Sequence, residues 1–486
     1  MVVIVSVSLI PLGLVAAYAI ANFRPLWLLA VFGLAGSVVL LSRIQWAALA
    51  LPVVIFLPNI GKDIPGPFAL FLHDLYILGL FGLYASRQIA RGERIVKLDR
   101  RAFLWLSAFV LLAGVSLIKA AMLERWIFMT GLKDWIRLVE LGLMTVTLAG
   151  IMDTAKTTQR MLKVTLAAGS AALAVAFWAY IADSDAFYGL MNLKRSTVQL
   201  GDLHYRMIST MGSAAHTGVA FATLAALATV LLRREYGVWV IGLGAALIAA
   251  SLGCVLLTYT KGTWVAFPLA LLVLWASGRL PRIWLYAVGG LLIVGAVTLV
   301  MFWPSELDPG VVVTDFFRVS RSSAEVRLDR WASVQNVLLR DPLIGVGYNV
   351  FAYVYGRYAI DPSVPFDYGH PHNMYVDVLT GTGIAGLVAF LGLLGRVLGI
   401  ARGLGRKAGL SARSAALGRA CYLALLVFLG ASLFNSFTFK AGRAAMLLFL
   451  VISIILALDR QRSGVEDGGA GYGVGQEREL EGPVGQ

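Results

Sequence analysis

The stretch HPHNMYVDVLTGTGIAGLVAFLGLLG, residues 370–395, begins with two histidines and an asparagine and continues as an apolar run. A long polar loop, residues 304–373, leads into that run. The run is long enough to cross a bilayer as a helix of about 20 residues. His370, His372 and Asn373 therefore lie where a loop enters a membrane helix, so two imidazoles and an amide are held at a membrane surface.

The composition of the chain is typical of a polytopic membrane protein. Hydrophobic residues make up 59% of the 486 residues, and charged residues only 14%. Because a bilayer offers no water to backbone groups, runs of about 20 apolar residues without strict alternation favour helices over a barrel. We therefore predict an all-α integral membrane protein with about 12–14 transmembrane helices. The predicted spans are residues 2–21, 25–41, 44–60, 68–90, 102–120, 132–151, 161–182, 211–232, 237–258, 262–277, 283–303, 374–399, 416–437 and 441–458.

The basic residues predict the orientation of these spans. The net charge is +14, but Lys and Arg form short clusters between apolar segments, a pattern that indicates membrane topology rather than nucleic-acid binding. An arrangement with both termini in the cytoplasm puts most of the clusters on the cytoplasmic side. The same arrangement sends the loop 304–373 to the outer side, with all five histidines at or near it.

Four parts are predicted along the chain. They are a transmembrane bundle (1–303, with outer-face segments 121–135, 183–210 and 259–262), an outer loop region (304–373), C-terminal transmembrane helices (374–459) and a Gly-rich, disordered cytoplasmic tail (460–486). Residues 123–140 mix tryptophans with charges and predict an interfacial or half-buried helix. Cys254 and Cys421 lie in apolar segments, so we expect no disulfide.

Cations that break the positive-inside pattern indicate an anionic ligand, because an outward-facing cation near a membrane needs a partner or a function. Arg206 precedes a span from the outer side, and Lys261 lies in a tight hairpin at residues 259–262. Arg327 and Trp331 share one helix face because they are four residues apart. A guanidinium binds phosphate oxygens with two donors, and Lys adds a point charge, so the group would suit a diphosphate. Lys261 alone fits equally a side chain that extends to the interface.

His372 is the strongest candidate for chemistry. The proline between the two histidines restricts His370, and His372 with Asn373 then lies at a helix start, where anions bind. A neutral imidazole can accept a proton from a hydroxyl group. A hydrogen-bonded structural histidine and a metal-ligand pair are the alternatives. His216 fits a structural or a functional role equally, and Asp377 fits either an orienting partner for an imidazole or a buried, hydrogen-bonded carboxylate.

These motifs, taken in order, resemble the O-antigen ligase/polymerase superfamily of bacterial envelope glycosyltransferases. The resemblance covers residues 206–390 and rests on Arg206 with Gly212, Thr260-Lys261-Gly262, Arg327-x3-Trp331, Pro342-x2-Gly345-x-Gly347-x3-Phe351, and His372-Asn373-x-Tyr375 with Gly383 and Gly386. The family often has Ser-Arg-Gly where this chain has Thr-Lys-Gly. The Gly345 and Gly347 pair predicts a tight turn more readily than a phosphate-binding loop.

The resemblance implies a GT-C-type enzyme in the bacterial inner membrane with its active site facing the periplasm. It implies an undecaprenyl-diphosphate-linked glycan as donor, no metal or other cofactor, and no obligate protein partner. By position, Arg206 and Arg327 would bind the donor diphosphate and take part in catalysis, and Lys261 and Arg330 are predicted to bind the same diphosphate. His372, with His370, would activate the acceptor hydroxyl. The predicted supporting residues are Asn373, Tyr375, Trp331, Asp377 and His216.

The leading hypothesis is an O-antigen ligase that transfers preassembled polysaccharide to the lipid A-core oligosaccharide. One long outer loop without an appended soluble domain favours this reaction. An O-antigen polymerase and a protein O-oligosaccharyltransferase are the alternatives within the family. A transporter of lipid-linked glycans would place its charges near the bilayer midplane, whereas here they gather at one face.

Overall fold

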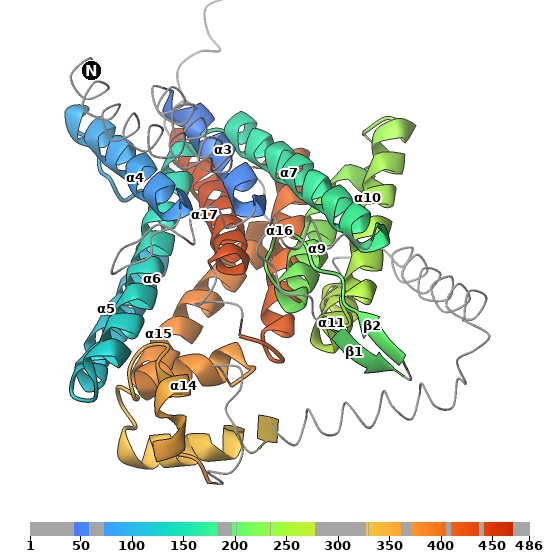
Figure 1. The fold of residues 1–486 in the computed structure, drawn as a ribbon. Helices are drawn as coiled ribbons and strands as arrows, with labels where there is room; N and C mark the ends of the chain where they lie inside the picture. The colour runs from blue at the N-terminus through green and yellow to red at the C-terminus, as the bar shows by residue number, and fades with distance from the viewer. Residues whose placement is uncertain are drawn as a thin grey trace, which may run out of the picture.

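The computed structural model describes residues 43–57, 72–182, 197–200, 202–233, 235–277, 327–328, 330–360, 371–404, 410–436 and 442–469. Figure 1 shows a bundle of helices. They are α3 (Ile44–Phe56), α4 (Leu72–Ala90), α5 (Arg100–Ala121), α6 (Arg125–Ile151), α7 (Ala155–Ile181), α9 (Ala214–Ala228), α10 (Val238–Leu257), α11 (Lys261–Ala276), α14 (Phe351–Val354), α15 (Met374–Leu404), α16 (Ala412–Ala431) and α17 (Arg443–Gly469), with the 3-10 helices η1 (Thr229–Leu232) and η2 (Tyr355–Arg357). A small antiparallel hairpin joins β1 (Thr197–Leu200) to β2 (Asp202–Tyr205).

Seven of these helices are long and apolar enough to cross a membrane, which confirms the predicted all-α integral membrane protein. They are α5, α7, α9 with η1, α10, α15, α16 and α17. The helices α3 and α11 are apolar but shorter. The predicted spans 2–21, 25–41 and 283–303 lie outside the described residues, so the total of 12–14 helices stays a prediction.

Two predicted boundaries differ from the observed elements. The expected interfacial segment 123–140 belongs to α6, which continues without a break from Arg125 to Ile151. Within it, Trp126 remains 51% exposed, whereas the indole of Trp135 donates to the carbonyl of Val110 at 2.9 Å and so ties α6 to α5. At the other end of the chain, α17 runs through Arg460, where the tail was expected to begin.

Several helices begin at a polar residue that satisfies backbone N–H groups. Asp99 accepts from the amide of Ala102 at the start of α5, and Thr154, Ser213 and Ser411 do the same for α7, α9 and α16. Such caps replace the water that the first turn of a helix would otherwise need. Asp99 also accepts two hydrogen bonds from Arg396, at 2.9 and 2.7 Å, and thereby joins the start of α5 to α15.

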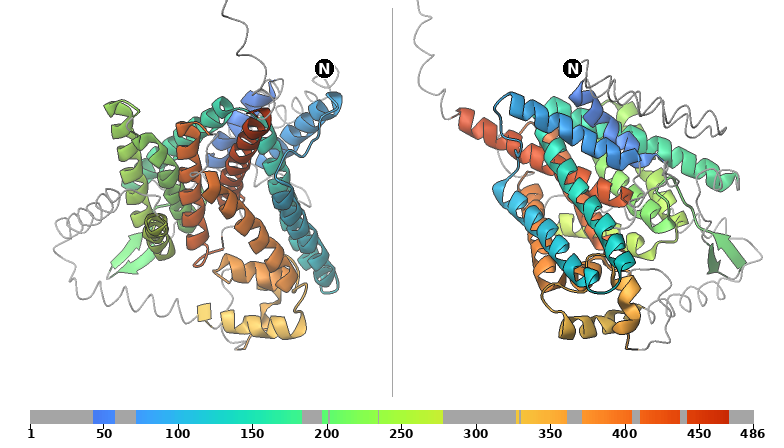
Figure 2. Two further views of the ribbon diagram at one scale, coloured as in Figure 1. Left: turned by 180° about the vertical axis from the view of Figure 1, so that it is seen from behind. Right: turned by 60° about the vertical axis from the view of Figure 1, so that its left-hand side comes forward.

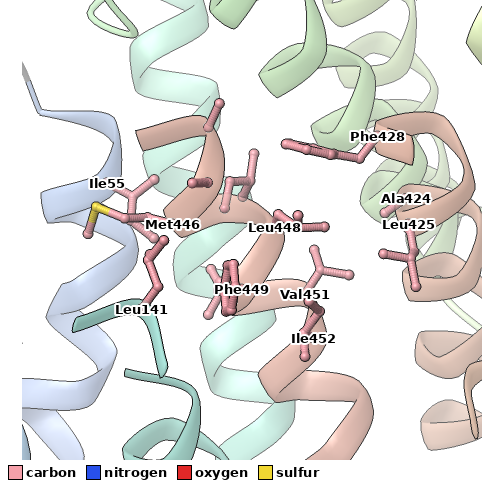
Figure 3. Close-up of a cluster of buried hydrophobic side chains, with 14 of the residues drawn as sticks. Ile55, Leu141, Ala424, Leu425, Phe428, Met446, Leu448, Phe449, Val451 and Ile452 are labelled. Carbon is pink, nitrogen blue, oxygen red and sulfur yellow. The ribbon is translucent and has the colours of Figure 1, made fainter. Parts of the chain in front are cut away.

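Helix α17 forms the centre of the bundle, with 83% of its most apolar window buried. Figure 3 shows its side chains between Ile55 and Leu141 on one side and Phe428 of α16 on the other. Phe428 and Phe449 are each only 1% exposed. Lipid tails are as apolar as these side chains, so close van der Waals packing, rather than escape from water, stabilises this arrangement.

Helix α15 is kinked at Gly383, where φ is 68° and ψ is −170°. The loop after residue 341 fills the break: the amides of Val346 and Gly347 donate to the carbonyls of Thr380 and Gly381, and the amide of Ile384 donates to the carbonyl of Pro342. Non-helical backbone is tolerated in a membrane domain only when its polar groups are satisfied in this way. In Figures 1 and 2, residues 330–360 and the first part of α15 lie together at the lower end of the bundle.

Candidate active site

The candidate site forms where several helix ends meet. The starts of α9, α11 and α15 and the ends of α10 and α16 supply its loops, and Arg327 and Arg330 lie on a helical turn beside them. Two glycines permit this close approach. A side chain at Gly262 would place Cβ 2.4 Å from Cβ of Phe434, and one at Gly218 would place it 3.0 Å from Oγ1 of Thr258.

Arg206 holds the turn that presents Lys261. Its Nε donates to the carbonyl of Thr258 at 2.8 Å, and its Nη2 reaches Oγ1 of Thr260 at 3.4 Å. Tyr259, between them, adopts a left-handed φ of 51°, which costs energy in a residue other than glycine. Part of the Arg206 fork, which was expected to bind a diphosphate, therefore fixes the backbone of this turn.

Four cations gather at this turn. The charges of Arg327 and Arg206 act on Lys261 and, together with burial as the larger cause, lower the pKa of its ammonium group. Burial and the neighbouring Arg330 likewise lower the pKa of Arg327. Arg330 is only 1% exposed. The structure thus brings together cations from three separate segments of the sequence and creates a strongly positive region. The cations are Arg206, Lys261 and the pair Arg327 and Arg330.

His372 lies beside this cationic cluster. Burial first, and then the charges of Arg327 and Arg330, lower the pKa of its imidazole to about 4, against the opposing effect of a side-chain hydrogen bond with Asn435. The imidazole is therefore neutral near pH 7 and able to accept a proton. The backbone at His372 has a left-handed φ of 55°. Strained conformations of this kind concentrate at functional sites, where the surroundings hold them in place.

Trp331 holds the segment that precedes His372. Its indole Nε1 donates to the carbonyl of Pro371 at 3.0 Å. Arg327 and Trp331 thus act from one helix face. The guanidinium of Arg327 acts through its charge on the imidazole of His372, and the indole of Trp331 donates to the backbone of the preceding residue. The two residues were predicted to share one helix face, and in the structure both interact with the segment around His372.

Asn373 and Tyr375 have structural contacts. The Oδ1 of Asn373 accepts from the amides of Tyr375 and Val376 at 2.9 and 3.2 Å, and so caps α15. The amide of Met374 donates to the carbonyl of Ser432. The expectation that this helix start binds an anion through its amides is therefore wrong, because those amides already have acceptors. The Tyr375 hydroxyl donates to the carbonyl of Leu429 at 3.0 Å and joins α15 to α16.

The remaining predicted residues lie at different distances from the cluster. Asp377 is buried and accepts from the Ser436 hydroxyl, a contact that fits the structural alternative. His216 lies in the first turn of α9, where its Nδ1 is 2.7 Å from Oγ of Ser213, the residue that caps the helix. The charge of Arg443, at the start of α17, acts on the same imidazole. His370 lies outside the described residues.

The turn interpretation of Gly345 and Gly347 fits the structure. Both glycines have positive φ, and the amide of Gly347 bonds to the carbonyl of Gly381. A Cβ at Gly345 would lie 2.4 Å from the carbonyl oxygen of Thr380. These glycines therefore allow the loop to enter the kink of α15, and the amide of Gly347 is turned to α15 rather than to a phosphate.

Sequence reasoning missed a second polar cluster, between α4 and α6. His73 Nε2 lies 3.0 Å from Asp74, and the Asp74 carboxyl group acts electrostatically on that of Glu140. Arg137 contacts Asp134 at 3.5 Å. Arg137 therefore lies beside acids of its own helix, and the spacing of three residues between 134, 137 and 140 was the available signal.

Asn435 was also missed, because it ends an apolar segment and has no motif around it. Its side chain forms a hydrogen bond with that of His372, so Asn435 is a further candidate for the site. Among the described residues, no three His, Cys, Asp or Glu side chains are grouped so that they could hold a metal ion.

Residues 245–391 match the family model described as O-antigen ligase. This segment of the chain is therefore similar to the O-antigen ligase family. The matched segment extends from α10 into α15 and includes Lys261, Arg327, Arg330 and His372, whereas Arg206 precedes it. No curated protein matches the chain.

Proposed function

We propose that this chain is an O-antigen ligase of the bacterial inner membrane. It would transfer preassembled O-antigen polysaccharide from undecaprenyl diphosphate to the lipid A-core oligosaccharide at the periplasmic face, as a step of lipopolysaccharide biosynthesis. The observation that carries this proposal is the buried imidazole of His372 beside a cluster of four cations, three of which lie with it in the segment that matches the O-antigen ligase family model.

The chemistry of the cluster fits transfer from a diphosphate. The acceptor oxygen forms a bond to the anomeric carbon of the donor sugar while the bond from that carbon to the diphosphate oxygen breaks. His372 takes the hydroxyl proton, and the diphosphate leaves with the bonding electrons. Arg206, Lys261, Arg327 and Arg330 stabilise the charge that develops on the leaving group, the type of contribution that is often the largest in catalysis.

Two other interpretations are less well supported. A transporter needs its binding charges where both sides of the membrane can reach them, near the midplane, whereas the four cations gather at helix ends. An O-antigen polymerase or a protein O-oligosaccharyltransferase would share the donor chemistry and differ in the acceptor. The identity of the acceptor therefore decides between the enzymes.

A reconstituted transfer assay tests the proposal. Purified protein and a lipid-linked glycan donor are offered lipid A-core, a second lipid-linked glycan and an acceptor peptide in competition, and the products are separated by mass. We expect transfer to lipid A-core, with a loss of at least ~10²-fold in His372→Ala.

The control variant Arg357→Ala removes an exposed cation of the same region and should retain activity. Thermal unfolding of both variants separates loss of chemistry from loss of folding. Normal transfer by folded His372→Ala would exclude the proposed base. Product on another acceptor would exclude the ligase assignment.

A further inference from the structure

A large cavity lies at the opposite end of the bundle from His372. Its volume is about 1070 Å³, and its walls come from the start of α3, the ends of α4 and α6, residues 460 and 461 of α17, and the start of α16. The candidate active site uses the end of α16 and the start of α15, so the 20 residues of α16, about 30 Å of helix, separate the two sites. The cavity is therefore no part of the proposed transfer site.

The cavity is basic. Five cations line it, against the two carboxylates Glu93 and Asp153; the cations are Arg43, Arg87, Arg91, Lys97 and Arg460. Lys97 is paired with Glu93. The net charge of the other lining residues is positive. The apolar side chains of Ile44 and Trp46 form another part of the wall. A charged group attached to an apolar chain would meet both kinds of surface here.

Arg460 supplies the observation that points to a ligand. Its Nη1 and Nη2 atoms are buried and have no hydrogen-bond partner within the described part of the chain, although Asp153 acts on it electrostatically. Buried donors without acceptors are costly and are rare in native proteins, unless an ion, water or ligand satisfies them. A planar guanidinium with two adjacent donors matches the oxygens of a phosphate group.

Hydrogen bonds and a close contact hold the wall beside Arg460 in place. The hydroxyl of Tyr84, another lining residue, donates to the carbonyl of Ile95 at 2.9 Å. A Cβ at Gly150 would lie 2.1 Å from that hydroxyl oxygen, so the glycine makes room for the ring. Gln461, next to Arg460, donates to the carbonyl of Met152 and to Thr158, each at 2.9 Å. These contacts hold this part of α17 in place.

We propose that this cavity binds a phosphate-bearing anion through Arg460. An anionic phospholipid headgroup and a soluble phosphate compound share this chemistry, and the apolar part of the wall favours the lipid. In the predicted orientation the cavity faces the cytoplasm, so its ligand would belong to the inner leaflet. The site is separate from the donor diphosphate and would stabilise the bundle rather than take part in transfer.

The test uses the purified full chain, delipidated in detergent. Thermal unfolding and native mass spectrometry are measured with short-chain phosphatidylglycerol, short-chain phosphatidylcholine or inorganic phosphate. Phosphatidylglycerol should raise the unfolding midpoint and remain bound, whereas phosphatidylcholine should do neither. The variant Arg460→Gln should bind phosphatidylglycerol about tenfold more weakly, since it loses a charge-assisted pair of hydrogen bonds.

Two further variants keep the test decisive. Arg91→Gln changes an exposed lining residue and should weaken binding without threatening the fold, whereas Arg94→Gln removes an exposed cation of the same loop that does not line the cavity and should bind normally. Equal stabilisation by inorganic phosphate would support the site and assign it to a soluble compound. Equal lipid binding by wild type, Arg460→Gln and Arg91→Gln, or an equal loss in Arg94→Gln, would overturn the proposal.

Discussion

At the scale of single residues, His372 owes its protonation state to its neighbours. Burial and the charges of Arg327 and Arg330 lower its pKa to about 4 in the protein without substrate. A base is lost as the pH falls through its pKa, so the group is available over the whole neutral range. A bound diphosphate would offset both guanidiniums and raise the pKa, and donor binding would thereby make the imidazole a stronger base.

The pH dependence of transfer measures this effect. The acidic limb of kcat/KM, which reports the free protein, should lie near pH 4, and the acidic limb of kcat should lie at higher pH. Arg327→Gln removes one of the charges and should shift the kcat/KM limb upward even if the rate falls. Arg340→Gln, which removes an exposed cation that does not act on His372, should leave the limb in place. This account would be contradicted if the acidic limb of kcat/KM lay near the ordinary histidine pKa and did not shift in Arg327→Gln.

The four cations show what a sequence can and cannot predict about a site. Their side-chain types and their position against the positive-inside pattern indicated an anionic ligand, and the structure brings them together. The sequence did not predict that Arg206 would also hold the turn before Lys261, because its contact with Thr258 joins residues 52 positions apart. Asn435 had no local signal at all, since its importance depends on His372, which lies on another segment.

At the scale of elements, the loop of residues 342–347 enters the kink of α15 and joins residues 330–360 to that helix. Gly345 should not tolerate a side chain, because a Cβ would lie 2.4 Å from the Thr380 carbonyl oxygen and the left-handed φ of 66° disfavours L-residues. We expect Gly345→Ala to destabilise the protein by at least ~1–2 kcal/mol from the backbone alone. Thermal unfolding in detergent measures the effect.

Gly356→Ala is the matched control for that substitution. Gly356 lies in η2, in the same region, and a Cβ there would meet nothing within 4 Å. Its unfolding temperature should stay close to that of wild type. Wild-type stability in Gly345→Ala would show that the loop does not depend on this close approach.

Helix positions were largely predictable, because long apolar runs in a bilayer have few alternatives to helix. The kink at Gly383 was not, since glycine within an apolar run is also found in straight membrane helices. What decides the kink is the loop of residues 342–347, which supplies partners for the freed backbone groups. The break and its partner are more than thirty residues apart, beyond the reach of any local pattern.

At the scale of the whole molecule, the distribution of Lys and Arg predicts the orientation in the membrane, and this orientation can be measured directly. Cys254 and Cys421 are both 0% exposed, so they should give little background with a thiol reagent. Leu328→Cys introduces a thiol at a position that is 58% exposed, and Arg94→Cys introduces one in the loop after α4. A membrane-impermeant maleimide should label Leu328→Cys in cells with a permeabilised outer membrane.

Arg94→Cys should react only after the inner membrane is opened. Wild type treated in parallel gives the background from the native thiols. Reversed labelling of the two variants would invert the orientation, and with it the periplasmic position of the proposed active site.

The contrast between α17 and α10 has a consequence for how this protein can change over generations. The apolar window of α17 is 83% buried, whereas that of α10 is only 22% buried, and Trp239 of α10 is 90% exposed. A change of volume in α17 disturbs neighbours on several sides, whereas a change on the exposed face of α10 meets no other part of the chain that the structure describes. Neutral substitutions should therefore accumulate on α10, whereas the side chains of α17 should change slowly.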